Sequence, residues 1–260
     1  MNREFGCQPF GHNAEERIEC LRMMKDIGFA NYFIGISTYE DADKIINAAE
    51  NIGIRLETIH SPFKDINRMW YDDPSGEGPL NMMLECLSFC ADHKVPIMVI
   101  HESANRVGPD MSNAGLARFR KIFEKGNELG VKIAVENVRR TNHLARIFHE
   151  NRDIPVYFCW DSGHELCYTP GVDHVAFLGD KLICTHLHDN HGIYMGDDHI
   201  LPFDGNMNWQ RKADFVKAAG YKGPLTMEIV RYRDLYNDWT DEQYLKTALE
   251  RVKRFAAMCE

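Results

Sequence analysis

The chain alternates eight short apolar runs with eight stretches of helical periodicity. Strands alternating with helices form parallel sheets, because each return to the sheet needs a crossover connection. Eight such units in 260 residues predict a closed α/β barrel of the (β/α)8, or TIM, type, folded as one domain over residues 1–260. We expect strands at 4–8, 32–36, 54–59, 96–100, 131–135, 156–160, 182–185 and 225–227. We expect helices at 14–26, 41–51, 79–92, 111–129, 141–151, 172–178, 209–219 and 241–258.

An open, doubly wound sheet is the alternative fold for the same alternation. Its dinucleotide-binding members carry a Gly-rich phosphate turn after the first strand, and no such turn follows residues 4–8. The sequence therefore favours the barrel and predicts no nucleotide cofactor.

Six of the predicted strands are followed directly by a side chain that can bind a metal ion. In a barrel of this type the carboxyl ends of the strands converge on one mouth, where active sites are built. We therefore expect one metal site at the C-terminal mouth, held by residues far apart in the sequence. The six residues are His60, His101, Glu136, Asp161, His186 and Glu228.

The last four of these strand ends supply two Glu, one Asp and one His. Carboxylates and an imidazole suit Mn²⁺, Mg²⁺, Co²⁺ or a distorted Zn²⁺ site. We predict that one divalent ion is bound by Glu136, Asp161, His186 and Glu228. Further ions or the substrate could be held by His60, His101, His164, Asp197 and His199. Arg231, just beyond Glu228, is predicted either to contact the substrate or to form a salt bridge at the rim.

The overall charge argues against a nucleic-acid partner. The chain has 30 basic and 39 acidic residues, a formal charge of −9, whereas binding a phosphate backbone needs a basic surface. None of the eight cysteines forms a Cys-x-x-Cys pair, no run approaches the roughly 18 apolar residues of a membrane helix, and the N-terminus lacks a signal-peptide core. We expect a reduced, cytoplasmic protein with no membrane span.

Several other side chains receive plainer interpretations. Helical or loop positions predict surface locations for His12, His93, His143, His149 and His174, and solvated helix faces for Arg118, Arg120 and Lys121. His188 is expected to support the ligands rather than to bind the ion itself. Aromatic residues that could cover a small sugar are Phe10, Phe63, Trp70 and Trp209.

Seven short motifs together resemble the xylose-isomerase-like barrel superfamily, which contains sugar phosphate isomerases and epimerases as well as endonuclease IV. They are IHSPF, VIHES, AVEN, WDSGH, HLHDN, DDHILPFDGN and MEIV, and the resemblance covers nearly the whole chain. In the sugar-active members, the resemblance implies one catalytic ion on Glu136, Asp161, His186 and Glu228, with His164 contacting the sugar. In endonuclease IV, nine residues would match a three-zinc cluster: His60, His101, Glu136, Asp161, His164, His186, Asp197, His199 and Glu228. Gly192 stands where the ketohexose epimerases carry an Arg.

Our leading hypothesis is a metal-dependent isomerase or epimerase of a small sugar, phosphorylated sugar or inosose. An ion would stabilise the enediolate formed when a proton leaves the carbon next to a carbonyl. Glu136 and Glu228 would act as base and acid, with substrate contacts from His164, His60 and His101. The alternatives are an endonuclease IV-like phosphodiesterase acting on abasic DNA and a barrel that binds metal or sugar without turnover. The oligomeric state stays open, a homo-oligomer included.

Overall fold

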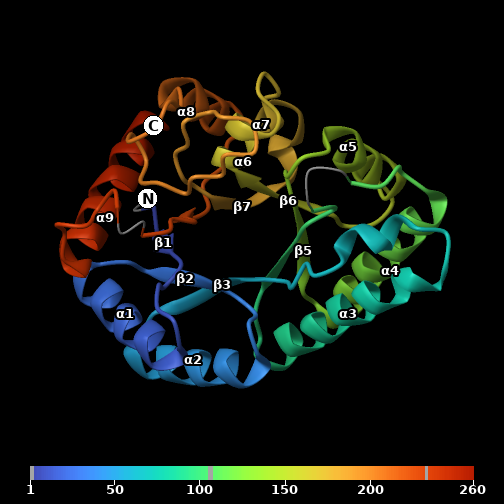
Figure 1. Cartoon of the computed structure of the whole chain (residues 1–260), viewed down its shortest axis with the longest axis horizontal. Coiled ribbons are helices and arrows are strands. Elements are labelled where there is room, and N and C mark those ends of the chain that lie inside the picture. The colour runs from blue at the N-terminus through green and yellow to red at the C-terminus, as the bar shows by residue number, and fades with distance from the viewer. Residues whose placement is uncertain (1–2, 105–107, 232–233) are drawn as a thin grey trace.

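Eight parallel strands form a nearly closed barrel with helices around its outside, which confirms the predicted TIM-barrel fold (Figure 1). The computed structural model describes residues 3–104, 108–231 and 234–260. The strands pair in the order β7-β6-β5-β4-β3-β2-β1-β8. The strands are β1 (Phe5–Cys7), β2 (Asn31–Gly35), β3 (Arg55–His60), β4 (Ile97–Ile100), β5 (Lys132–Glu136), β6 (Tyr157–Asp161), β7 (Leu182–His186) and β8 (Leu225–Met227). The α-helices are α1 (Ala14–Ile27), α2 (Tyr39–Ile52), α3 (Glu77–Asp92), α4 (Asn113–Leu129), α5 (Thr141–Glu150), α6 (Ser162–Cys167), α7 (His174–Leu178), α8 (Trp209–Ala218) and α9 (Asp241–Met258).

The barrel closes between β7 and β8 at a seam that is less regular than the other strand pairs. The Thr185 hydroxyl accepts from the Thr226 amide at 3.0 Å and donates to the Thr226 carbonyl at 3.2 Å, in place of ordinary ladder bonds. Just beyond β7, the Leu187 amide donates to the Thr226 carbonyl at 2.9 Å and the Glu228 amide donates to the Leu187 carbonyl at 3.2 Å. The ends of β7 and β8 are thereby held side by side.

Local sequence signals account for the helix ends. Asn13 caps α1 by accepting from the Glu16 amide, and Gly53 ends α2 in the left-handed conformation, which costs glycine little. Thr240 and Gln243 form a reciprocal capping box at the start of α9. These caps agree with the expected positions of the three helices.

α7 corresponds to the short helix expected at 172–178, but the other short helices were not predicted from the sequence. α6 has six residues, too few for a helical period to emerge, and it begins because Asp161 accepts from the His164 amide at 2.6 Å. The irregular stretch 61–78 contains the 3-10 helices η1 (Ile66–Trp70) and η2 (Pro74–Gly76), and a further one, η3 (Gly179–Lys181), precedes β7. α6 matters most, because it starts at the mouth of the barrel.

Three residues predicted to lie on the surface are buried, and these expectations were wrong. The His174 ring faces the Glu165 carboxylate, with Nδ1 2.9 Å from Oε2. The His143 ring packs edge-on against Trp70, at a centroid distance of 4.6 Å. Arg118 is 8% exposed and donates to the carbonyls of residues 69, 71 and 73. Each has tertiary partners that helical periodicity cannot reveal.

Two of the aromatic residues considered as a cover for a sugar are instead part of the packed interior. Trp70 is 1% exposed and its indole N–H donates to the Glu102 carbonyl at 2.7 Å. Trp209 is 4% exposed and donates to Asp189 Oδ2 at 2.8 Å. Phe63, by contrast, is 47% exposed at the mouth. Among the described residues, no helix is both long enough and apolar enough to cross a membrane.

Candidate metal centre and active site

The strand ends bring the predicted ligands together at the C-terminal mouth. His60, Glu136, Asp161 and His186 are the last residues of their strands, and His101 and Glu228 directly follow β4 and β8. Ligand atoms of Glu136, Asp161, His186 and Glu228, called here the inner ring, all lie within 4.8 Å of one another. Both glutamates of the ring are therefore close enough to reach one ion.

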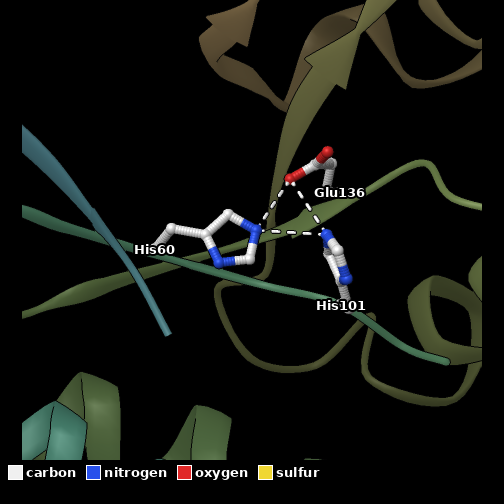
Figure 2. Close-up of side chains that lie close together, drawn as sticks. All are labelled: His60, His101 and Glu136. Atoms are coloured by element: carbon white, nitrogen blue, oxygen red, sulfur yellow. Dashed lines mark hydrogen bonds and ion pairs between the residues drawn. The ribbon is translucent and has the colours of Figure 1, made fainter. Parts of the chain in front are cut away.

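A second group of candidate ligand atoms, from the three side chains drawn in Figure 2, shares Glu136 with the inner ring. His60 Nε2 lies 3.1 Å from His101 Nε2 and 3.3 Å from Glu136 Oε2, and His101 Nε2 lies 3.5 Å from the same oxygen. His60 Nδ1 is 2.8 Å from the Ser61 carbonyl, which can only accept, so the ring proton sits on Nδ1. Nε2 is therefore the His60 ring nitrogen that is available to bind an ion.

A third group comes from α6 and from the segment after β7. The Asp197 Oδ2 atom lies 3.1 Å from His164 Nε2 and 3.3 Å from His199 Nε2. His164 Nδ1 lies 2.9 Å from Glu136 Oε1, which links this group to the inner ring. His199 has a left-handed backbone (φ 48°) and its Nδ1 donates to the Glu228 carbonyl at 2.8 Å. Such backbone strain in a non-glycine residue is typical of functional sites.

His188 lies behind the ligands and fixes Asp161. Its Nε2 is 3.0 and 3.2 Å from the two Asp161 carboxylate oxygens, and its ring stacks on His199 at 3.9 Å. Gly163 makes this packing possible, because a Cβ at this position would lie 1.9 Å from His188 Cε1. These contacts agree with the supporting role expected for His188.

The paired acids and imidazoles shift one another's pKa values. Burial raises the pKa of Glu136, but the facing His186 and His101 rings outweigh it and hold the pKa well below the ordinary 4.5. Burial lowers the pKa of His186, but Glu228 and Glu136 outweigh it and hold the pKa well above 6.5. For His101, burial dominates and lowers the pKa. An ion bound at the inner ring would therefore displace a proton from His186, whereas an ion bound by the neighbouring His60–His101–Glu136 group would find the His101 ring neutral.

The donor chemistry of the site fits a divalent ion. Both Glu136 oxygens and both His186 ring nitrogens are buried without a hydrogen bond of good geometry, although they lie close to other charged groups. Buried polar atoms are normally hydrogen-bonded, so atoms that converge without such bonds indicate a missing partner. Carboxylate oxygens mixed with imidazole nitrogens suit Mn²⁺, Zn²⁺ or a similar ion.

A cavity of about 290 Å³ opens above the ligands. Glu228 lines it with a side chain that is 19% exposed, whereas Glu136 is fully buried. Phe63 lies over one wall, with its ring 4.7 Å from that of His101. Arg231 points elsewhere: its Nε is 3.2 Å from Asp241 Oδ1, which is the rim salt bridge named as one of its two expected roles.

Arg139 is a cavity residue that sequence reasoning missed. Its guanidinium lies 3.9 Å from the centre of the Tyr168 ring and donates to the Tyr168 hydroxyl at 2.6 Å. Tyr168 in turn donates to Asp197 Oδ2 at 2.9 Å. The one available signal was its position three residues after Glu136, in the loop that leaves β5 at the mouth.

Comparison with known families now decides the classification. The family model for the xylose isomerase-like TIM barrel matches residues 21–255. The chain belongs to this family. The resemblance inferred from the seven sequence motifs is thereby confirmed.

Individual relatives share the fold at modest identity. An uncharacterized protein, y4fM, of Sinorhizobium fredii is 39% identical over 108 residues, which cover 39% of this chain and 34% of that protein. The crystal structure of a D-tagatose 3-epimerase-like protein matches with a TM-score of 0.76 and 18% identity, over 98% of both chains. The structure of an L-ribulose 3-epimerase matches with a TM-score of 0.78 and 16% identity, over 100% of this chain and 96% of the other.

Proposed function

We propose that this protein is a divalent-metal-dependent isomerase or epimerase of a carbohydrate. The observation that carries the proposal is the inner ring: two glutamates, an aspartate and a histidine from four successive strands within 4.8 Å of one another. Family membership and the likeness to structures titled as sugar epimerases support it.

The ion would be held by Glu136, Asp161, His186 and Glu228. When bound, it would supply Lewis-acid stabilisation of the negative charge that develops on a substrate oxygen during enolisation. The remaining chemistry is proton transfer by this chain's own side chains.

Glu228 and Glu136 are the proposed acid and base. Both carboxyls have pKa values held low, because facing imidazoles outweigh the effect of burial, so both are ionised near neutral pH. One would accept the proton from the substrate carbon, and the other would return a proton to that carbon only after taking one from solvent. Glu228 reaches the cavity directly, which makes it the group most open to a substrate carbon. His164, His60 and His101 line the same cavity, which supports the proposal that they bind hydroxyl or carbonyl oxygens of the substrate.

Solvent exchange provides the test. The protein, loaded with Mn²⁺, Co²⁺ or Zn²⁺, is incubated with a panel of ketoses and inososes in heavy water, and deuterium uptake is followed by NMR. We expect Glu136→Gln and Glu228→Gln each to lower exchange by roughly 10²–10⁴-fold. Glu19→Gln, which changes an exposed glutamate on α1, is the matched control. Full exchange in both ring variants would remove these glutamates from the mechanism.

A metal-dependent phosphodiesterase of the endonuclease IV type is the second candidate. The observation favouring it is that all three ligand groups, including His60–His101–Glu136 and His164–Asp197–His199, lie at one mouth. The net charge of −9 opposes it, because DNA binding needs a basic surface. Cleavage of an abasic-site duplex at low salt, with zinc or manganese present, would favour this candidate over the isomerase.

A further inference from the structure

A second hollow, larger than the cavity above the ligands, lies next to it on the segment between β3 and α3. We call it the outer hollow; it measures about 630 Å³, against about 290 Å³ for the inner cavity. The two share Phe63 and Ala104, so they meet at the Phe63 side chain. The inner cavity alone is slightly smaller than the range for ligand sites, which is roughly 300–1,000 Å³.

A buried arginine fixes the wall of the outer hollow. Arg118 reaches from α4 and donates to the carbonyls of Met69, Tyr71 and Asp73 at 2.9, 2.6 and 2.7 Å. It also pairs with Glu77, with Nε 3.0 Å from Oε1. The Arg118 guanidinium thus holds the backbone that forms one wall of the outer hollow, while the hollow itself stays open.

A reciprocal amide pair ties the same segment to the loop after β4. Asn67 Nδ2 donates to the Ala104 carbonyl at 2.7 Å, and the Ala104 amide donates to Asn67 Oδ1 at 2.8 Å. Figure 1 shows this segment, in cyan, running from β3 towards α4. Because Ala104 lines both cavities, the pair fixes the position of the outer hollow relative to the ligands. A site shaped in advance in this way loses less entropy when it binds.

The side chains that face the outer hollow combine aromatic and polar groups. Phe63 and Tyr71 are 47% and 45% exposed, so both rings offer an open face to the hollow. Lys64, Arg68 and Ser75 add charged and hydroxyl groups around them. A sugar ring has apolar C–H faces and hydroxyl edges, so it matches aromatic faces flanked by hydrogen-bonding groups.

We propose that the outer hollow binds a second sugar unit attached to the one that reacts. The substrate is then a ketose that carries a glycosyl group rather than a free monosaccharide. This inference rests on the proposed function, because the reacting sugar is assigned to the cavity above the inner ring. Phe63 sits where the two units join, with its ring 4.7 Å from His101 on one side and the outer hollow on the other.

Saturation-transfer NMR on the metal-loaded protein tests the inference without turnover. The probes are D-fructose and three of its glucosides, isomaltulose, turanose and leucrose, which place the glucosyl unit at different positions. We expect protons of the glucosyl ring to be saturated in at least one glucoside, which binds about threefold to tenfold more tightly than fructose. No saturation of any glucosyl ring would overturn the inference.

Two variants distinguish sugar binding in the outer hollow from sugar binding elsewhere on the surface. Tyr71→Ala removes an exposed ring while keeping the carbonyl that Arg118 binds, and Lys64→Ala removes a neighbouring charge. We expect Tyr71→Ala to abolish the gain in affinity for the glucoside and to leave fructose unchanged. Phe177→Ala on α7, where the ring is also 45% exposed and outside both cavities, is the matched control and should change neither.

The possible failures can be told apart. If fructose exchanges deuterium in heavy water but Tyr71→Ala and Lys64→Ala leave glucoside binding unchanged, the inference is wrong and the proposed function stands. If glucosides bind through Tyr71 but neither they nor any free ketose exchange, the proposed function fails while the sugar-binding hollow stands. If Tyr71→Ala instead dissociates an oligomer in sedimentation, the hollow is an interface between copies and the inference is overturned.

Discussion

Replacing Gly163 by Ala tests how closely the ligands depend on the groups packed behind them. A Cβ at this position would lie 1.9, 2.3 and 2.5 Å from three atoms of the His188 ring, far inside van der Waals contact. His188 is fully buried between Asp161 and His199, so the ring cannot move without disturbing one of them. Overpacking of this kind costs about 1–3 kcal/mol.

The expected fall in melting temperature follows from that cost. For chains of about this size each kcal/mol lowers the Tm by roughly 2–4 °C, which gives a fall of roughly 2–12 °C, measured by circular dichroism. Displacement of His188 also releases Asp161, a proposed ligand. Loss of such a supporting contact weakens metal binding by about 10–100-fold, which competition with a fluorescent chelator can measure.

Matched variants make the reasoning refutable. Gly78→Ala on α3 is the control, because a Cβ there meets nothing within 4 Å and a helical Gly→Ala change otherwise stabilises by up to about 1 kcal/mol. In a His188→Ala background the clash disappears, so Gly163→Ala should cost at least about 1 kcal/mol less than in the native protein. Equal costs in the two backgrounds, or a Gly163→Ala protein as stable as Gly78→Ala, would refute the account.

Three further outcomes follow from the described contacts. Arg118→Met should destabilise by about 2–4 kcal/mol in urea unfolding, because three carbonyls lose a charged donor, while Arg120→Met, at a surface ion pair with Asp153, should cost clearly less. Glu57→Gln should raise the Tm at pH 8 but not at pH 4. Burial raises the pKa of Glu57, so the native protein loses stability as pH rises above the ordinary carboxyl range, and the neutral Gln avoids that loss. An equal gain in Tm at both pH values would contradict this. Metal affinity measured by calorimetry should increase with pH, and metal binding should release protons. The reason is that Glu228 and Glu136 outweigh burial, raise the pKa of His186 and keep it protonated without the ion. An affinity that does not depend on pH would count against His186 as a ligand.

The barrel and the meeting of the strand ends were predictable because both depend on short-range patterns. An apolar run followed by His60, Glu136 or His186 fixes where a strand stops, and a parallel barrel then places every such stop at one mouth. The inner ring could therefore be predicted without knowing the conformation of any loop. Metal binding by that ring, and the roles of its glutamates, remain predictions.

Contacts that depend on tertiary packing could not be predicted in this way. His174 and Arg118 lie on helices whose sequence suggests solvent, and only the packed neighbours Glu165 and the 69–73 backbone bury them. Trp70 was one of four aromatic residues that could have covered a sugar, but its N–H donates to the Glu102 carbonyl in the interior. Arg139 reaches the cavity only because Tyr168, almost thirty residues later in the chain, lies beneath it.

The seam between β7 and β8 has a consequence for how the barrel is held together. Its regular backbone pairing is replaced by the Thr185 hydroxyl and by single bonds from the Leu187 and Glu228 amides. Directly above, His186 and Glu228 face each other across the same joint, with Nδ1 2.9 Å from Oε2. An ion bound by both side chains would cross-link β7 and β8 where their backbone pairing is irregular, so metal loading would also stabilise the closed barrel.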